Sequence, residues 1–407
     1  MIKYLIFLLA FSTNVFSQSG WKNLNSGITT NLFSVSVISQ DIVLVCGSGG
    51  VILKSINSGV NWENKNSGTG FDLYNINFLN LTTGFVCGGV FNGNGLILKT
   101  TDAGENWQNV LQITNSNLYS VIMINELTGF SAGSSGNSGV CYKTTNGGNN
   151  WSLVCTINNN ILTGISFLNS ETGYASGKRI LKTTNGGVNW SEQYNDTNYF
   201  FSNVFSENNF VYLCSYNGHI AKSIDYGLTW NIYSTGFEIP LRSLYFTNNQ
   251  TGFVCGNDGY LFKTENAGLN WTRQLVHANQ YLMGIDFVNS NVGFIAGFSG
   301  KILKTQNGGV NIQKINTQIP VSNILHQNFP NPFNPETNIN FSINKTGKTT
   351  LNIYDINGKL IKQLYSGVLN SGNYSFQFKS ENLSSGIYFY ELSTPDDKQF
   401  KKMTLIK

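Results

Sequence analysis

KTTNGGVNW, residues 182–190, is one copy of a nine-residue phrase that decides the fold of this 407-residue chain. Similar phrases begin at Lys54, Lys99, Lys143, Lys222, Lys263 and Lys304, and the starts lie 39 to 45 residues apart. That spacing is the length of one four-stranded blade of a β-propeller. Because a single such sheet leaves both of its faces open, copies form a core by stacking around an axis. The repeat therefore predicts an all-β chain with a seven-bladed β-propeller.

The order of strands within each repeat follows from short apolar runs. A second strand, often of the form TGFVCG or VGFIAG, follows the first, and a third such as GYLFKT leads into the phrase. The residue that ends the phrase opens a fourth, outer strand. The seven inner strands are expected to begin at Leu32, Leu73, Leu118, Leu162, Phe201, Leu241 and Leu282.

The phrase itself is predicted to be a tight turn that needs no ligand. Its fourth residue is Asn or Asp, which can bond the backbone two residues on, and its sixth is always Gly, which tolerates positive φ. Five copies carry Asn at the fourth position, which argues against a calcium site, because Ca²⁺ favours negatively charged carboxylate ligands. The Trp that ends six copies is expected to pin the turn to its blade, and the Lys that begins every copy is expected on a solvated rim. The turn residues are Asn57, Asp102, Asn146, Asn185, Asp225, Asn266 and Asn307, with Trp62, Trp107, Trp151, Trp190, Trp230 and Trp271.

The phrase resembles the Asp box, or BNR repeat. The longer string TGFVCGNDGYLFKTENAGLNW, residues 251–271, resembles the repeat of the photosystem II assembly and stability factor family. The resemblance covers about residues 20–317 and implies a seven-bladed propeller. It implies no single activity, because Asp boxes also occur in sialidases, other glycosidases and sorting receptors.

Two segments could supply the last strand of the ring. The phrase from Lys304 ends in Ile312 where the others have Trp, so the seventh blade lacks its usual fourth strand. WKNLNSG from Trp21 matches WENKNSG from Trp62 and has no phrase before it, which favours closure by the N-terminal strand. IQKINTQ, residues 312–318, is the alternative.

The ends of the chain differ in character from the propeller, which is expected over residues 18–318. Residues 1–17 have a positive start, a short apolar run and small residues before Gln18, as a signal peptide has. Residues 319–336 hold four of the six prolines and are interpreted as a linker. Residues 337–407 contain six strand-like runs with Asn357-Gly358 and Ser385-Gly386 as turn signals, which predicts a small Ig-like β-sandwich.

This C-terminal part resembles the sorting domain of the type IX (Por) secretion system. NFPNPFNPETNINFSI, LNIYDINGKLIKQL, LSSGIYFYEL and KKMTLIK follow one another over residues 327–407. The resemblance implies that the secretion machinery is a partner, that the chain passes through the periplasm, and that it ends secreted or on the outer-membrane surface.

Composition and residue spacing argue against several other classes. A net charge of +4 over the whole chain leaves no basic patch for nucleic acid, and no segment is long enough to be a membrane helix. Isolated histidines give no metal site, and no cofactor is expected. Cys141 and Cys155 lie equally far from Gly148 on the two arms of one hairpin, so they could form a cross-strand disulfide.

The sequence favours a binding, adhesion or scaffold module over an enzyme. Loops into first strands and between second and third strands share one face, and aromatic groups there suit a carbohydrate or an extended peptide. A sialidase-like glycoside hydrolase is the alternative, but it needs three converging Arg and the chain has only Arg179, Arg242 and Arg273. An assembly factor for a membrane complex is a third class. The candidate ligand-binding face carries Phe33, Tyr74, Phe91, Tyr119, Lys178, Tyr216, Arg242, Tyr281 and Phe298.

Overall fold

The computed structural model describes residues 20–90, 93–196, 198–274, 276, 279–310, 312–316, 318–380 and 383–407. It forms two compact units, Gly20–Val310 and a C-terminal unit over residues 312–407. The signal peptide predicted over residues 1–17 lies outside the described residues.

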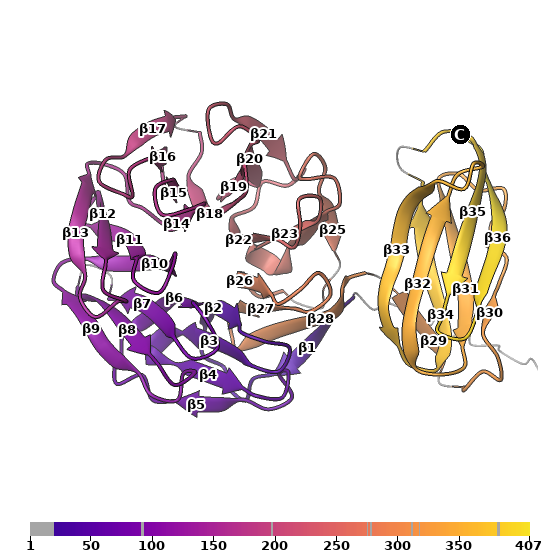
Figure 1. The fold of residues 1–407 in the computed structure, drawn as a ribbon, viewed down its shortest axis with the longest axis horizontal. Helices are drawn as coiled ribbons and strands as arrows, with labels where there is room; N and C mark the ends of the chain where they lie inside the picture. The colour runs from indigo at the N-terminus through magenta and orange to yellow at the C-terminus, as the bar shows by residue number, and fades with distance from the viewer. Residues whose placement is uncertain are drawn as a thin grey trace, which may run out of the picture. The chain divides into compact units, whose positions relative to one another are not determined.

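The N-terminal unit consists of seven four-stranded antiparallel sheets arranged as blades around an axis (Figure 1). The first strands, nearest the axis, are β2 (Leu32–Val37), β6 (Asp72–Phe78), β10 (Asn117–Met123), β14 (Gly164–Phe167), β18 (Phe201–Glu207), β22 (Leu241–Phe246) and β26 (Leu282–Phe287). The second strands are β3 (Val43–Gly47), β7 (Gly84–Gly89), β11 (Gly129–Ser135), β15 (Gly173–Ser176), β19 (Phe210–Ser215), β23 (Gly252–Gly256) and β27 (Gly293–Gly297). The predicted seven-bladed propeller is confirmed.

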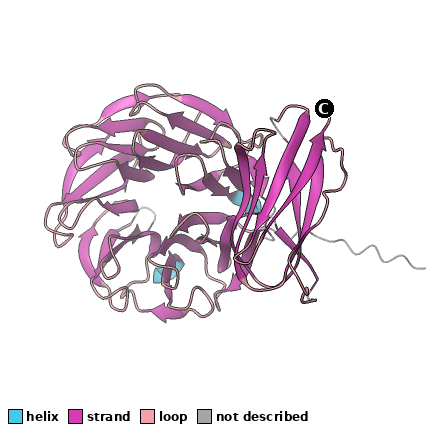
Figure 2. Cartoon of the chain, turned by 45° about the vertical axis from the view of Figure 1, so that its right-hand side comes forward, coloured by secondary structure: helices cyan, strands magenta, loops and turns pink. Residues whose placement is uncertain are grey.

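The outer half of each blade contains the nine-residue phrase between two strands. The third strands are β4 (Ile52–Ser55), β8 (Gly95–Thr100), β12 (Ser138–Thr144), β16 (Ile180–Thr183), β20 (His219–Ser223), β24 (Leu261–Thr264) and β28 (Lys301–Gly309). The fourth strands are β5 (Glu63–Lys65), β9 (Gln108–Ile113), β13 (Ser152–Ile157), β17 (Ser191–Tyr194), β21 (Asn231–Ser234), β25 (Thr272–Gln274) and, for the seventh blade, β1 (Gly20–Asn25). The described helices are two short 3-10 turns, η1 (Ser48–Gly50) and η2 (Asn257–Gly259), drawn in cyan in Figure 2.

The N-terminal strand closes the ring, as the first of the two alternatives predicted. β1 pairs antiparallel with β28, and Trp21 lies opposite Thr305. Trp21 thereby occupies the position that Trp fills in the other blades, and it packs edge-on against Phe253 and Phe287 at 6.0 and 5.8 Å between ring centroids. Only 4% of Trp21 is exposed, so this residue supplies the missing Trp of the seventh blade from the other end of the propeller.

Side-chain hydrogen bonds hold the phrase as a turn, as expected. In the fourth blade, Gly187 N donates to Thr183 Oγ1 (2.9 Å), and Thr183 Oγ1 donates to Asn185 Oδ1 (3.1 Å). Asn185 Oδ1 also accepts from Asn189 N at 2.9 Å. The Asn185 side chain therefore binds the amide four residues on and not the predicted one two residues on. The amide two residues on, Gly187 N, donates to the Thr183 hydroxyl instead.

The glycine of each phrase packs on the blade before it. Gly187 has φ +80°, and an added Cβ would lie 2.5 Å from a ring carbon of Phe130, which belongs to the second strand of the third blade. The same arrangement recurs around the ring, with Leu44 taking the place of the aromatic residue in the first blade. Glycine is therefore required for two reasons: the backbone has a positive φ, and the neighbouring blade leaves no space for a side chain.

Four of the seven lysines that begin the phrases are buried and the other three are partly buried, so the expectation of a solvated rim is wrong. Lys143 Nζ lies 5.2 Å from the centroid of the Phe130 ring and donates to Gly186 O of the next blade at 2.7 Å. Lys304 makes the equivalent contacts with Phe294 and with Ser58 of the first blade. The aromatic face and the neighbouring backbone carbonyl replace part of the water around these ammonium groups.

The C-terminal unit is a sandwich of two four-stranded antiparallel sheets, ordered β29-β34-β31-β30 and β33-β32-β35-β36. Its six main strands coincide with the six predicted apolar runs. Their apolar faces meet in a core that includes Ile339, Phe341, Leu351, Ile353 and Met403. The strands are β29 (Ile312–Asn316), β30 (Ile324–Leu325), β31 (Glu336–Ile343), β32 (Gly347–Tyr354), β33 (Leu360–Leu369), β34 (Gly372–Lys379), β35 (Gly386–Ser393) and β36 (Lys398–Leu405).

The boundary between the units lies earlier than the predicted residue 318. β29 pairs with β34 of the sandwich, which excludes residues 312–316 as the closing strand of the propeller. The Pro-rich stretch 319–336 is also part of the sandwich and not a linker. Phe333 is 2% exposed and pairs with Leu405, and Asn328 N donates to Tyr390 Oη at 2.8 Å. Proline prevents regular strand pairing there, but these apolar and polar contacts fix the chain to the sheets.

Replacing the turn glycine should lower the free energy of unfolding by more than the penalty for its positive φ alone. Gly187→Ala adds an αL penalty of about 1–2 kcal/mol and overpacking against Phe130 of about 1–3 kcal/mol. Gly27→Ala is the matched control, because Gly27 also has φ +76° but an added Cβ there meets nothing within 4 Å. In chemical unfolding, Gly187→Ala should lower the free energy of unfolding clearly more than Gly27→Ala does. Equal losses of stability in the two variants would refute the contact between blades.

Truncating the closing tryptophan should open the ring. Trp21→Ala removes a large buried aromatic and should lower the free energy of unfolding by about 3–5 kcal/mol. Trp21→Phe, which keeps a ring against Phe253 and Phe287, should lose distinctly less. A loss below about 1 kcal/mol for Trp21→Ala in denaturant titrations would show that β1 does not close the propeller.

Candidate functional site

The candidate site lies at the mouth of the propeller, where six of the seven first strands begin with a β-bulge. In the first blade Leu32 pairs with Gly47 and Ser34 with Cys46, so Phe33 between them has no partner across the ladder. Bulges re-aim a side chain away from the regular pleat and are frequent beside functional sites. The same shift of register leaves Phe33, Tyr74, Tyr119, Ser202, Arg242 and Met283 without a ladder partner, and of these Ser202 is buried.

Five predicted residues form a continuous row of rings, here named the aromatic arc. Ring centroids are separated by 5.1 Å between Tyr281 and Phe298, 6.0 Å between Phe298 and Phe33, 5.5 Å between Phe33 and Tyr74, and 5.3 Å between Tyr74 and Tyr119. All five are partly exposed. The arc therefore crosses the seventh, first, second and third blades, and it offers contiguous apolar faces to a ligand.

A second aromatic group lies on the fifth and sixth blades. The Arg242 guanidinium is 4.7 Å from the centroid of Tyr216, and Phe200 stacks on the same ring at 5.1 Å. Arg242 Nε also donates to Asn257 Oδ1 at 2.9 Å. Burial raises the pKa of Tyr216, and its electrostatic neighbours include Tyr119 of the arc. We name Phe200, Tyr216 and Arg242 the cationic cluster.

The structure brings seven of the nine predicted residues into these two groups. Lys178 is exposed on the loop between β15 and β16 and belongs to neither group. Phe91 lies outside the described residues. Sequence reasoning missed Phe200, although its place directly before the buried Phe201 is the same signal that marked Tyr281 before Leu282.

The arginines do not converge as a sialidase-like site would require. Arg179 pairs with Glu192 on an outer strand at 3.0 Å. Arg273, on the outer strand β25, stacks over Tyr260 at 3.8 Å. Only Arg242 reaches the mouth. Among the described residues no group of His, Cys, Asp or Glu is arranged to hold a metal ion, and no helix is long and apolar enough to cross a membrane.

The inner carboxylates bind backbone amides of neighbouring blades. Asp72 Oδ1 accepts from Gly49 N at 2.9 Å. Asp286 Oδ2 accepts from Val37 N of the first blade at 2.7 Å, and its Oδ1 accepts from Phe287 N at 2.8 Å. Desolvation nevertheless raises the pKa of Asp286 to about 7, although these two amides act in the opposite direction. Asp286 therefore joins the seventh blade to the first, as Ser34 and Asn75 join other blades through Ile76 and Val121.

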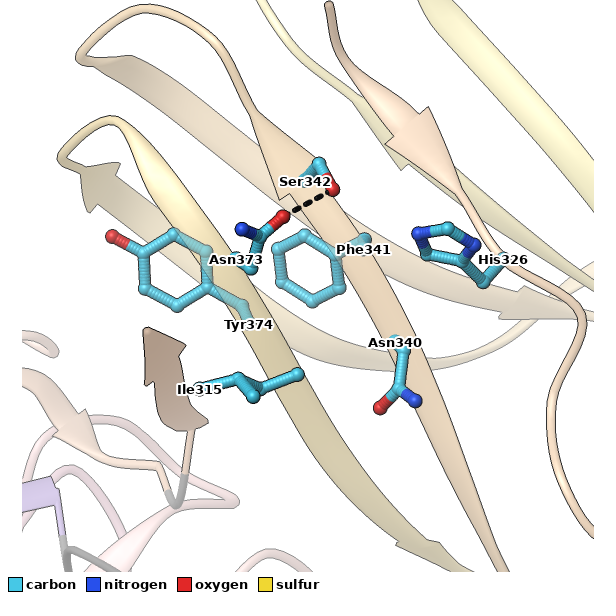
Figure 3. A pocket seen from close by; sticks show the side chains of 7 residues that line it. All are labelled: Ile315, His326, Asn340, Phe341, Ser342, Asn373 and Tyr374. Atoms are coloured by element: carbon cyan, nitrogen blue, oxygen red, sulfur yellow. Dashed lines mark hydrogen bonds between the residues drawn. The ribbon is translucent and has the colours of Figure 1, made fainter. Parts of the chain in front are cut away.

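A pocket of about 330 Å³ lies within the C-terminal unit (Figure 3). Ser342 Oγ donates to Asn373 Oδ1 across β31 and β34 at 2.6 Å, and His326 lies on the β30 side. Its lining mixes amide, hydroxyl and imidazole groups with apolar side chains from the same sheet. The lining residues are Ile315, His326, Asn340, Phe341, Ser342, Asn373 and Tyr374.

Comparison with protein families confirms the two resemblances. Residues 13–158 match the family described as photosynthesis system II assembly factor YCF48, and residues 327–407 match the secretion system C-terminal sorting domain. The second match indicates export through the type IX secretion system to the cell surface or the outside, and an interaction with that machinery. No curated protein matched the sequence.

Solved structures with the same fold have low sequence identity to this chain. YCF48 bound to D1 peptide is 18% identical, with a TM-score of 0.58 over 70% of this chain and 96% of that one. YCF48 from Cyanidioschyzon merolae is 17% identical, with a TM-score of 0.59 over 70% and 98%. The GH74 enzyme of Niastella koreensis is 14% identical, with a TM-score of 0.59 over 95% of this chain and 75% of that chain. At these identities the likeness shows the fold and no activity.

Asp286 should give the propeller a measurable pH dependence. Its folded pKa is raised, so the protonated form favours folding at low pH, and this contribution is lost as pH rises from about 4 through about 7. Asp286→Asn cannot titrate. The difference in melting temperature, wild type minus Asp286→Asn, should therefore fall between pH 4.5 and 7.5 in calorimetric scans. A difference that is flat or rises with pH would contradict the raised pKa.

Proposed function

We propose that this exported propeller is a binding module that holds an extended peptide segment across the aromatic arc. The observation that supports it most is the arc itself, with four successive ring contacts between 5.1 and 6.0 Å on partly exposed side chains. A folded monomer has no structural need to leave five neighbouring rings accessible at its mouth. The match to a sorting domain supports a site of action at the cell surface or outside.

The two mouth groups suit an extended peptide with apolar side chains and at least one acidic or carboxylate group. The arc supplies rigid apolar faces with few rotatable bonds, so little side-chain entropy is lost on binding. Arg242 adds a planar cation already oriented by Asn257 and Tyr216. The structure of YCF48 bound to D1 peptide shows that a propeller of this fold can hold a peptide.

Two other functions receive less support. A glycoside hydrolase would need free carboxylates at the axis, but Asp72 and Asp286 accept hydrogen bonds from backbone amides. A role as an assembly factor for a membrane complex would rest on the likeness to YCF48, and that likeness is limited to the fold. Adhesion through a carbohydrate would use the same arc, so the test below includes glycans.

A binding screen with the purified full chain tests the proposal. Arrays of peptides and of glycans identify the ligand class, and Kd values are then measured for wild type and Tyr74→Ala. Losing one ring of the arc should weaken peptide binding about 3- to 10-fold, the equivalent of roughly 0.5–1.5 kcal/mol. Tyr226→Ala is the matched control, since Tyr226 is 52% exposed on a turn between third and fourth strands, at the opposite end of the blades.

The possible outcomes separate the alternatives. Peptide binding that Tyr74→Ala weakens and Tyr226→Ala does not supports the proposal. Binding to glycans alone would replace it with carbohydrate adhesion, and hydrolysis of an arrayed glycan would replace it with enzyme activity. Equal effects of both variants would place the ligand away from the arc.

A further inference from the structure

Two cysteines of the third blade lie directly opposite each other. Cys141 on β12 and Cys155 on β13 are paired across the antiparallel ladder, with a β-bulge immediately after Cys141. Both are free thiols in the structure. Cys141 is fully buried, while Cys155 is partly exposed on the outer strand.

Their opposed positions in the ladder are compatible with the Cα separation that a disulfide needs. Directly opposed residues in an antiparallel pair have Cα atoms about 4.5–5.5 Å apart. A disulfide needs a Cα separation of about 4.4–6.8 Å, so the whole range expected for an opposed pair falls inside that window. The neighbouring Cys155 thiol, followed by burial, raises the pKa of the Cys141 thiol.

The four remaining cysteines have different surroundings. They lie on second strands of four different blades, and none has another cysteine opposite it in its sheet. Cys46 Sγ donates to Leu73 O at 3.3 Å, and Cys214 Sγ lies 3.3 Å from Ser202 Oγ. All four are buried. Burial, followed by the thiols of Cys87 and Cys214 in the adjacent blades, raises the pKa of Cys46 and Cys255, but these pairs lie on different sheets.

We propose that Cys141 and Cys155 form a disulfide in the exported protein. Export takes the chain into compartments where disulfides form and persist. The Cys155 thiolate attacks a small-molecule or protein disulfide, forming a mixed disulfide and releasing one thiol. The Cys141 thiolate then attacks Cys155 Sγ and releases the second thiol, so the oxidant gains the two electrons that the cysteines lose, and their two protons pass to the released thiols through solvent.

The bridge would secure an outer edge strand. β13 forms the outer edge of its blade, and the phrase that connects it to β12 carries Lys143, Gly148 and Trp151. A covalent link across β12 and β13 closes this hairpin in the unfolded chain and restrains its fraying in the folded one. The third blade also presents Tyr119 of the arc, so the bridge stabilises a blade that takes part in the proposed site without contacting it.

Thiol counting and peptide mapping on the full chain test the proposal. The purified protein is equilibrated in a glutathione buffer with the redox poise of an oxidising secretory compartment, then unfolded and alkylated. We expect four of the six thiols to react, and non-reducing digestion should link the peptides that contain Cys141 and Cys155. Six reactive thiols, or a link between any other pair, would overturn the proposal.

A stability comparison provides a second readout that does not depend on mapping. Adding reductant should lower the melting temperature of the wild type by roughly 5–10 °C, the shift expected for a hairpin of this size. Cys155→Ser should melt at the same temperature with and without reductant, whatever its absolute stability. A reductant-dependent shift that persists in Cys155→Ser would mean that the stabilising oxidation lies elsewhere.

Discussion

Contact between each turn glycine and a large side chain of the blade before it holds the propeller together. Gly187 lies against the Phe130 ring, and the Lys143 ammonium lies over the same ring and donates to Gly186 O. Backbone, ring and cation thus meet across two sheets. A single blade can form its own strands and turn, but these contacts exist only when two blades are adjacent, which makes the stability of each blade depend on its neighbour.

In a ring of such contacts the first and last blades are not joined by the continuous chain, so their junction needs its own closing strand. Here the junction is closed by β1, which places Trp21 against Phe253 and Phe287 in the seventh blade. Asp286 adds a carboxylate bond from the seventh blade to Val37 in the first. The first strand in the chain is therefore paired with one of the last strands of the propeller, and the ring completes only after most of the unit has been synthesised.

The sequence predicted those features that depend on local pattern. Phrase spacing predicted the blades, the missing Trp at Ile312 predicted closure by Trp21, and alternation predicted the six main strands of the sandwich. The Pro-rich segment was misjudged because composition excludes regular strands but does not show whether residues such as Phe333 are packed. The buried lysines were missed because their partners come from another strand and another blade. For the candidate site, strand starts located the mouth residues, while the contacts between rings depend on distances between blades that no single repeat contains.

The bulges at the mouth separate the proposed binding surface from the pairing that folds the strands. Phe33, Tyr74, Tyr119 and Arg242 have no partner in the ladder, so their side chains contribute to the mouth while the residues on either side carry the pairing. Changing such a residue alters the chemistry of the surface and leaves strand register as it was. The propeller therefore has one freely variable position in most of its blades, and descendants of the same scaffold could acquire new ligands by substitution at these positions without first regaining stability.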